Sequence, residues 1–400
     1  MNVLHAAAQF VTVSCSILAL GWLAQALAAF RGVPTLPDLP RSHPSLPNPA
    51  PGSGPDVTVI VPACNEEKTI AATLRSLLAS TGIRLQIVAV NDRSTDSTGA
   101  QMDAVAAEAA ATPHTLEVIH NRDLPEGWLG KTHALSLAAS RATAPWLLFT
   151  DGDVRFHPQA VSLTHAYAQA ENADHVVLFL TMELKTIAEA AVLAAFQALS
   201  SWNMHLWKVA DPKARDFFGT GGFNLVRRQV YEHLGGFEAL RMQVVEDMRL
   251  AWTVKRAGFA SRVVLGPGLV RIYWIQGALG IVGLLEKNGF AGLRYSIGLS
   301  LFVFLAFAAD IAFPLAAIAL GGWSMAAGLL AYLFIFLTYA ANRRVTRISP
   351  WLALLFAPAT AILLFALARS MVLALSRGGI RWRGTLYPLD ELRRSVGPDW

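Results

Sequence analysis

The sequence predicts an α/β protein with a doubly wound, mostly parallel sheet of Rossmann-like type, an N-terminal transmembrane helix and several C-terminal ones. Between about residues 56 and 265, short apolar runs alternate with helical segments, as in a parallel sheet covered by helices. Apolar runs long enough to cross a bilayer lie on either side of that region. Of the 400 residues, 54% are hydrophobic and 15% are charged, which is too apolar for a purely soluble protein.

The N-terminal apolar run extends from Ala6 to Phe30 without a charged residue, and Arg31 follows it. Because it is long enough to span a bilayer, we expect residues 1–31 to be a transmembrane helix. A cleaved signal peptide is the alternative, but no basic residue precedes the run, and the run is long for such a peptide. By the positive-inside rule, Arg31 and Arg41 place the next segment in the cytoplasm.

A proline-rich segment follows this run. Residues 32–55 contain eight prolines and no apolar run that could build a core. This composition favours an extended linker that spaces the next domain from the membrane.

Residues 56–265 are expected to form one soluble domain, because strand-like and helical segments alternate through them. The expected strands span residues 57–61, 85–90, 116–120, 145–149 and 176–181. The expected helices are one that ends at residue 80 and three over residues 97–111, 131–140 and 186–209, the last with Trp202 and Trp207.

Beyond this domain the chain is expected to return to the membrane. Residues 266–296 mix apolar residues and glycines with a polar Glu-Lys-Asn patch, which suits interfacial helices better than a span. Residues 297–376 are expected to be a transmembrane region, with spans over 297–320 and 323–340. A carboxylate facing lipid at mid-depth costs about 2.5–3.5 kcal/mol, so Asp310 should face other helices.

The last apolar run, Trp351 to Ser376, allows two interpretations. If it spans the bilayer, the basic residues after it lie outside, against the positive-inside rule. Pro358 could instead bend the run into a re-entrant hairpin. We expect the second arrangement, with residues 377–400 as a basic cytoplasmic tail.

Charge and cysteine content narrow the range of partners. The net charge is +5, and arginines cluster at the edges of apolar stretches, which indicates a membrane surface or a phosphate ligand. Aromatic and basic residues do not interleave as in a nucleic-acid binder, so we expect no nucleic-acid partner. Cys15 and Cys64 are expected to be free thiols in a reducing compartment.

Asp151 and Asp153 are the strongest candidate site residues. They follow the predicted strand 145–149, and open α/β sheets bind ligands at the carboxyl ends of their strands. Two carboxylates so close repel each other unless a cation lies between them, and Mg²⁺ or Mn²⁺ takes oxygen ligands and bridges to substrate phosphates. The alternative is a surface turn, since Asp-Gly is a common turn pair. We expect a site for a metal and a diphosphate.

Acidic residues occur at two further places in the domain. Asp92 follows the second predicted strand and could accept a hydrogen bond from a base or ribose, whereas nearby Asp96 could cap a helix. Glu246 and Asp247 follow a glycine-rich loop at 219–223, where a substrate can approach the backbone closely. A carboxylate beyond such a loop could be a general base, or it could simply favour a helix start.

Taken in order, these motifs resemble the membrane-anchored glycosyltransferase family 2. They are Val-Pro-Ala-Cys-Asn-Glu-Glu, Val-Asn-Asp-x-Ser-x-Asp-x-Thr, Gly-Trp-Leu-Gly-Lys, Thr-Asp-Gly-Asp, the glycine-rich loop and Glu-Asp, within about residues 57–256. The resemblance implies a GT-A fold and inversion of the anomeric centre. Residues 125–131 and 382–387 further resemble the branch that glycosylates lipids such as carotenoid acids, hopanoids and ceramide. Thr385 stands where that branch has arginine, which weakens a diphosphate role there.

The resemblance implies a role for each set of motif residues. The base and ribose of a nucleotide would be held by Pro62, Ala63, Asn65, Glu66 and Asp92. The diphosphate would lie near Lys131 and Asp151, although Lys131 could also be an ordinary exposed lysine. The metal, Mg²⁺ or Mn²⁺, would be flanked by Asp151 and by Asp153 as the direct ligand. The base would be Asp247, with Glu246 beside it, and the acceptor side would be lined by Gly221, Gly222 and Phe223.

The expected function is therefore an inverting hexosyltransferase that moves one sugar from a nucleotide-diphosphate sugar, expected to be a UDP-sugar, to a membrane lipid. We expect a multi-pass protein of the cell membrane with its catalytic domain in the cytoplasm. The enzyme alternatives are a polyisoprenyl-phosphate sugar synthase and a transferase that extends a polysaccharide, although the Gln-x-x-Arg-Trp motif of processive synthases is absent. The non-enzyme alternative is an inactive membrane scaffold that binds sugar nucleotides.

Overall fold

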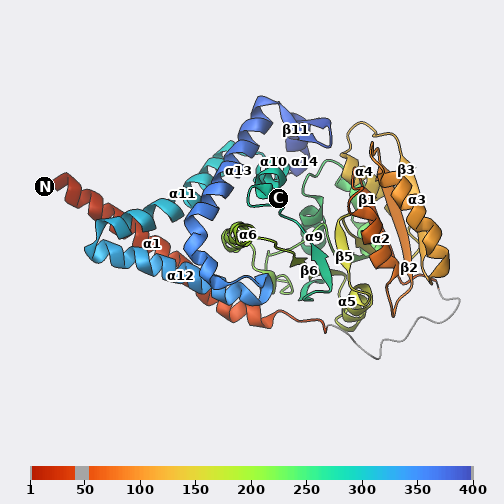
Figure 1. Ribbon diagram of the computed structural model, residues 1–400, viewed down its shortest axis with the longest axis horizontal. Helices are drawn as coiled ribbons and strands as arrows, with labels where there is room; N and C mark the ends of the chain where they lie inside the picture. The colour runs from red at the N-terminus through yellow and green to blue at the C-terminus, as the bar shows by residue number, and fades with distance from the viewer. Residues whose placement is uncertain (1, 41–53, 398–400) are drawn as a thin grey trace.

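A sheet domain lies beside a group of long helices in the computed structural model, which describes residues 2–40 and 54–397 (Figure 1). Three of the long helices extend away from the sheet domain, and a fourth, α13, lies between them and the domain (Figure 1). The predicted division into a membrane part and an α/β part is therefore visible in the arrangement of the chain.

The main sheet has seven strands in the order β3-β2-β1-β4-β8-β6-β9. Only β8 runs antiparallel to its neighbours, so the predicted mostly parallel sheet is confirmed. The strands are β1 (Val57–Ala63), β2 (Leu85–Asp92), β3 (Thr115–Asn121), β4 (Trp146–Phe149), β6 (His175–Phe179), β8 (Asn224–Arg227) and β9 (Ser261–Leu265).

Helices cover both faces of this sheet, as the doubly wound pattern predicts. Successive side chains of a strand point to opposite faces. Val59 accordingly belongs to the core under α2 and α3, whereas Ile60 belongs to the core under α4 and α9. The helices of the domain are α2 (Ile70–Leu78), α3 (Thr98–Glu108), α4 (Gly130–Ala139), α5 (Ala160–Ala170), α7 (Arg228–His233), α8 (Gly236–Ala239) and α9 (Glu246–Arg256), with the short 3-10 turn η2 (Ala109–Ala111).

A second, three-stranded sheet joins this domain to its helical neighbours. It has the order β5-β10-β7, with β5 (Val154–Phe156), β7 (Thr181–Met182) and β10 (Val270–Ile272). β10 lies where interfacial helix was expected, and α10 (Gly280–Gly292) begins only after it. The helix expected over 186–209 is also shorter: α6 (Ile187–Ser200) ends before Trp202, and Trp207 lies in the 3-10 turn η3 (Leu206–Lys208).

Within the described residues, four helices are long and apolar enough to cross a membrane. They are α1 (Asn2–Gly32), α11 (Ile297–Leu320), α12 (Gly322–Thr346) and α13 (Phe356–Ser376) with the preceding 3-10 turn η4 (Pro350–Leu355). Large apolar side chains are exposed along the first three, among them Phe10, Ile17, Phe302, Leu305 and Trp323. Asp310 is buried, as predicted, and its Oδ1 accepts a hydrogen bond of 2.9 Å from Trp22 Nε1.

The hairpin expected at Pro358 does not form. Pro358 lies in the first turn of α13, where a missing backbone N–H is tolerated. α13 therefore continues as one helix along α6 and α10, and the chain after it returns to the sheet domain. That tail forms a two-stranded hairpin, β11 (Gly379–Trp382) and β12 (Thr385–Pro388), followed by α14 (Leu389–Val396).

The described part of the predicted linker packs on the sheet domain. It begins with the 3-10 turn η1 (Val33–Thr35). Leu39 N donates to Leu265 O at 2.7 Å, and Leu265 N donates to Pro37 O at 2.8 Å, so this segment pairs with the edge strand β9. Arg344 of α12 donates to Val33 O at 2.9 Å and forms an ion pair with Asp38 at 2.7 Å. Residues 41–53 of the predicted linker lie outside the described residues.

Candidate functional site

The turn that follows β4 carries Asp151 and Asp153, as the sequence predicts. β1, β2 and β4 are parallel neighbours, so their carboxyl ends meet at one edge of the sheet. Two hydrogen bonds hold the turn: Thr150 Oγ1 donates to Gly222 O at 2.8 Å, and Thr73 Oγ1 donates to Gly152 O at 2.9 Å. The first of these bonds ties the acidic turn to the glycine-rich loop.

Lys131 joins the two predicted halves of the site. Its Nζ lies 2.6 Å from Asp151 Oδ1 and 2.6 Å from Glu246 Oε1. Burial alone would lower the pKa of Lys131, but the charges of Asp151, Glu246 and Asp247 outweigh it and hold that pKa well above its ordinary value. Lys131 is therefore a charged bridge between the acids after β4 and the acids at the start of α9, and not an ordinary exposed lysine.

The glycine-rich loop lies so close to these acids that side chains would collide with them. A Cβ at Gly221 would lie 2.4 Å from Asp151 Oδ2, and one at Gly219 would lie 2.1 Å from Asp247 O. Gly221 thus lies against the acids, and its acceptor-side role, like that of Gly222, stays a prediction. Phe223 does not line the pocket: it is fully buried, with its ring centroid 6.2 Å from that of Phe156, so it supports the loop from the core.

Glu246 and Asp247 form the first turn of α9, where the positive end of the helix dipole favours acids. The backbone of Asp247 is held by Asn224 Nδ2, which donates to its carbonyl oxygen at 3.3 Å, and its Oδ1 accepts from Met248 N at 2.7 Å. A small pocket opens here, and acids from two of the three predicted sites line it. They are Asp151, Glu246 and Asp247, joined by Lys131, Gly221, Thr150, Thr220, Asn224 and three apolar residues.

Asp153 has the properties expected of a metal ligand. Its Oδ1 is buried and lacks a hydrogen-bond partner among the described residues. Burial and the neighbouring charges of Asp151 and Glu66 raise its pKa to about 7. Within residues 2–40 and 54–397 no three acidic, histidine or cysteine side chains form a complete metal cage. A carboxylate pair suits Mg²⁺ or Mn²⁺, which usually completes its shell with water and substrate phosphates.

The predicted nucleotide-binding residues line up along the ends of β1 and β2. Pro62 and Ala63 end β1, and Asn65 follows with a positive φ of 56°. Asn65 Oδ1 accepts from Thr95 N at 2.8 Å, which fixes the loop after β1 to the loop after β2. In the same loop pair, Asp96 Oδ1 accepts from Thr98 N at 3.0 Å just before α3, but the N-cap residue of that helix is Ser97 and not Asp96.

Asp92 is buried and already has partners. Its carboxylate accepts from Arg93 Nη2 at 2.8 Å and from Asn121 Nδ2 at 2.8 Å. A Cβ at Gly130 would lie 2.7 Å from Asp92 Oδ2, so the start of α4 closes over this carboxylate. A base or ribose bound here would share Asp92 with Arg93 and Asn121, two residues that the sequence did not single out.

The C-terminal hairpin reaches the predicted nucleotide site. Arg383, at its tip, forms an ion pair with Glu66. Tyr387 is buried, and its hydroxyl accepts a hydrogen bond of 3.1 Å from Gly130 N. The resemblance of residues 382–387 to lipid glycosyltransferases was the only sequence signal that linked this tail to the site.

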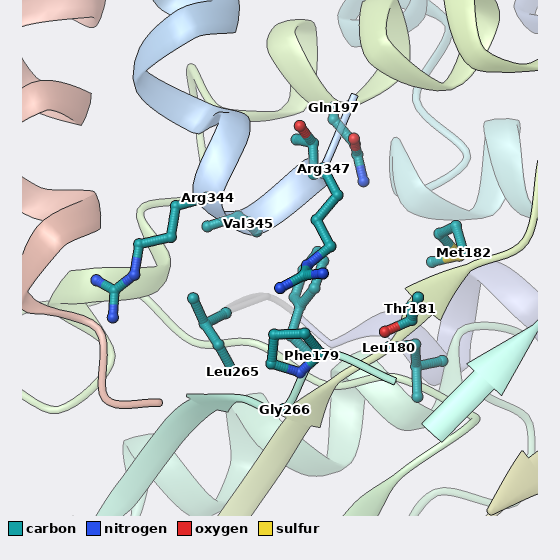
Figure 2. Close-up of a pocket in the computed structure, with 12 residues that line it drawn as sticks. Phe179, Leu180, Thr181, Met182, Gln197, Leu265, Gly266, Arg344, Val345 and Arg347 are labelled. Carbon is teal, nitrogen blue, oxygen red and sulfur yellow. The ribbon is translucent and has the colours of Figure 1, made fainter. Parts of the chain in front are cut away.

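The larger of the two pockets described, drawn in Figure 2, has none of these acids in its wall. Arg347 extends toward Gly266 inside it, while Arg344 points away from its centre (Figure 2). None of the predicted site residues lines it. Its wall includes Leu180, whose Cδ1 would lie 2.4 Å from a Cβ at Gly222, so it lies behind the glycine-rich loop. We regard this pocket as part of the contact between the sheet domain and the C-terminal end of α12.

Comparisons with known proteins bear on this site. Residues 58–235 match the model of Glycosyl transferase family 2. A 4,4'-diaponeurosporenoate glycosyltransferase of Staphylococcus aureus (strain MRSA252) is 25% identical over 195 residues, which are 48% of this chain and 50% of that protein. The matched region thus spans about half the length of this relative.

A solved structure shares the architecture. It is a mannosyltransferase from Pyrobaculum calidifontis in complex with GDP-Man and Mn2+, 17% identical, with a TM-score of 0.53 over 90% of this chain and 99% of that chain. At 17% sequence identity this similarity is evidence for the fold alone. It confirms the GT-A-like sheet with helices that the sequence predicts.

Proposed function

We propose that the protein is an inverting glycosyltransferase, because residues 58–235 match the model of Glycosyl transferase family 2. It moves a single sugar from a nucleotide-diphosphate sugar to a membrane lipid at the cytoplasmic face. The observation that most supports this function is the Lys131 bridge between Asp151 and Glu246. Asp151, assigned to the diphosphate, and Asp247, assigned as the base, line one small pocket with Lys131, which supports the proposal.

The donor side of the pocket suits a nucleotide diphosphate. Asp151 and Asp153 would hold Mg²⁺ or Mn²⁺, in keeping with the Mn2+ in the mannosyltransferase complex. A bound divalent cation supplies Lewis-acid stabilisation of the negative charge that develops on the leaving diphosphate. Lys131 adds a fixed positive charge beside Asp151, and the loop containing Asn65 and Glu66 offers polar groups to the base and ribose.

The opposite side of the pocket suits the acceptor. Where the acceptor attacks through a hydroxyl group, Asp247 takes its proton, and Glu246 is held beside Asp247 by Lys131. Gly221 lines the pocket, and because it has no side chain, a substrate there would meet the backbone of the glycine-rich loop. Attack from this side and departure on the diphosphate side amount to one displacement, which inverts the anomeric centre.

The helices support a membrane lipid as the acceptor. The Arg344 contacts with Val33 and Asp38 bring the ends of α1 and α12 together beside the sheet domain. Arginines gather at that end, namely Arg31, Arg343, Arg344 and Arg347, and by the positive-inside rule they support a cytoplasmic position for the domain. A relative named for glycosylation of a carotenoid acid agrees with a lipid acceptor.

Reconstituted protein incubated with labelled UDP-glucose or GDP-mannose and a bacterial lipid extract tests this function. We expect label in the organic phase, dependent on Mg²⁺ or Mn²⁺ and lost in D153A and D247A. A water-soluble polymer as the sole product would contradict the lipid acceptor. Unchanged turnover in both variants would overturn the assigned site.

A further inference from the structure

Lys287 is a second lysine at the acid cluster, and it comes from outside the family 2 domain. It lies on α10, and its Nζ is 4.2 Å from the ring centroid of Trp382 and donates to Asn288 Oδ1 at 2.9 Å. The charges that act on its ammonium are those of Glu246, Lys131, Asp247 and Asp151. Lys287 therefore lies near enough to the predicted base for their charges to interact, and its helix packs on α13, one of the long apolar helices.

This ammonium has no carboxylate partner of its own. Lys131 forms ion pairs with two acids, whereas no ion pair of Lys287 occurs in the described part of the chain. An amide oxygen and an aromatic face stabilise a cation without neutralising it. Burial lowers the pKa of Lys287, and an added anion would oppose that shift. The position is suited to a ligand that brings a negative charge.

One face of α10 leads from the molecular surface to this ammonium. Residues four apart share a helix face, so Leu279, Gly283 and Lys287 lie in one row. Leu279 is 68% exposed, and a Cβ at Gly283 would meet no atom within 4 Å. At 1.5 Å per residue the row is about 12 Å long. The row begins at an apolar residue, Leu279, passes the open position Gly283 and ends at the cation Lys287. It therefore matches a lipid with an anionic group at its reacting end.

We infer, within the function proposed above, that Lys287 selects an anionic acceptor: it binds the carboxylate or phosphate of a membrane lipid beside Asp247. The lipid chain lies along the Leu279–Gly283 face of α10. In the transfer, an oxygen of the acceptor anion forms a bond to the anomeric carbon while the bond from that carbon to the diphosphate oxygen breaks. The bonding pair leaves with the nucleoside diphosphate. The product is a glycosyl ester or a glycosyl phosphate, and Asp247 orients the acceptor because no proton is removed.

Three acceptors in lipid nanodiscs test the selection: a long-chain isoprenoid carboxylic acid, a polyprenyl phosphate and the neutral polyprenol. We expect kcat/KM for one of the two anions to exceed that for polyprenol by about tenfold or more, the worth of one charge-assisted hydrogen bond. K287M should lower kcat/KM for that anion about 10- to 100-fold, mainly through KM, and leave polyprenol unchanged. K287R should recover much of the loss. Which anion reacts decides between the carboxylate and the phosphate.

Two results would overturn the selection: a wild-type preference for polyprenol, or an equal loss for all three acceptors in K287M. Label transfer to none of the lipids, from UDP-glucose or GDP-mannose, would instead refute the transferase function itself. Retained binding of the donor, measured by calorimetry, shows that K287M is folded.

The open face of α10 has a matched control on the same helix. G283L should fill the row and reduce transfer to the long-chain anion, while a short-chain acid should still react. Gly292 lies nine residues on, on the opposite face, and is also open, so G292L should change neither rate. Equal effects of G283L and G292L would exclude the row as the path of the lipid chain.

Discussion

Lys131 Nζ lies 2.6 Å from Glu246 Oε1, where the start of α4 meets the start of α9. The same ammonium lies 2.6 Å from Asp151, so one cation stabilises two acids from distant parts of the chain. Removing one partner of a buried ion pair costs about 3–5 kcal/mol, because it leaves the other charge unpaired. Loss of Lys131 should therefore lower both the stability of the protein and its transferase activity.

We expect K131M to lower the thermal unfolding midpoint by several degrees and to abolish detectable transfer. In K131M/E246Q one of the two unpaired charges is gone, so the midpoint should recover in part while activity stays lost. Differential scanning fluorimetry in detergent measures the first effect, and labelled-donor turnover measures the second. An additive loss in the double variant would show that Lys131 and Glu246 are not coupled.

Gly221 should tolerate no side chain. The Cβ of G221A would lie 2.4 Å from Asp151 Oδ2 and must displace either the loop or the carboxylate. A displacement of about 1 Å at a reacting centre can cost roughly 10²-fold in rate, so we expect a loss of that order in kcat/KM. G292A, at an open position, is the control and should keep wild-type rates.

Asp153 should make the metal-free protein less stable as pH rises. The ordinary pKa of its carboxyl is 3.8, and in the folded protein it is raised to about 7, so the folded state binds the proton more tightly. The free energy of unfolding therefore falls between these two pH values and levels off above the higher one. Thermal unfolding in EDTA from pH 5 to pH 8 measures this slope.

The D153N variant should remove most of that slope, because its amide does not titrate. Added Mn²⁺ should raise the unfolding midpoint of the wild-type protein more at pH 8 than at pH 5, since metal and proton compete for one carboxylate. A slope that D153N leaves intact would place the titrating group elsewhere.

The two contacts of the C-terminal hairpin should separate binding from stability. Arg383 and Glu66 are partly exposed, so R383A should change the unfolding midpoint little but weaken donor binding through the loop of Glu66. Y387F should do the reverse, because it leaves the buried Gly130 N–H without its acceptor, at about 1–3 kcal/mol. Donor calorimetry and thermal unfolding of the two variants, side by side, test this contrast. A large decrease of the unfolding midpoint in R383A would show that the ion pair at the hairpin tip is needed for stability.

The sequence predicted the features that depend on local pattern. Alternating apolar runs located β1 to β4, and their order along the chain placed Asp92 and Asp151 at one edge of the sheet. β8 was not among the expected strands, because a run of four residues is too short to show a strand period, and nothing in such a run indicates its direction. Phe223 was assigned to the acceptor side by the family resemblance, although its ring belongs to the core.

Contacts between distant segments were beyond such patterns. Lys287 reads as one polar residue in an interfacial helix, and only the packing of α10 brings it to the acids of α9. Pro358 predicted a bend because proline breaks helix interiors, but its place in the first turn of α13 made it harmless.

The pairing of Leu39 with Leu265 joins the end of α1 directly to an edge strand of the sheet. The described residues after α1 therefore do not act as a loose tether, and Arg344 fastens the same segment to α12. If α1 and α12 cross the bilayer, the pocket is held at one set height above the lipid headgroups. We expect the protein to discriminate acceptors by the depth of their reactive oxygen in the bilayer. A lipid whose reactive oxygen lies too deep, or too far above the headgroups, would not react, whatever its chemistry.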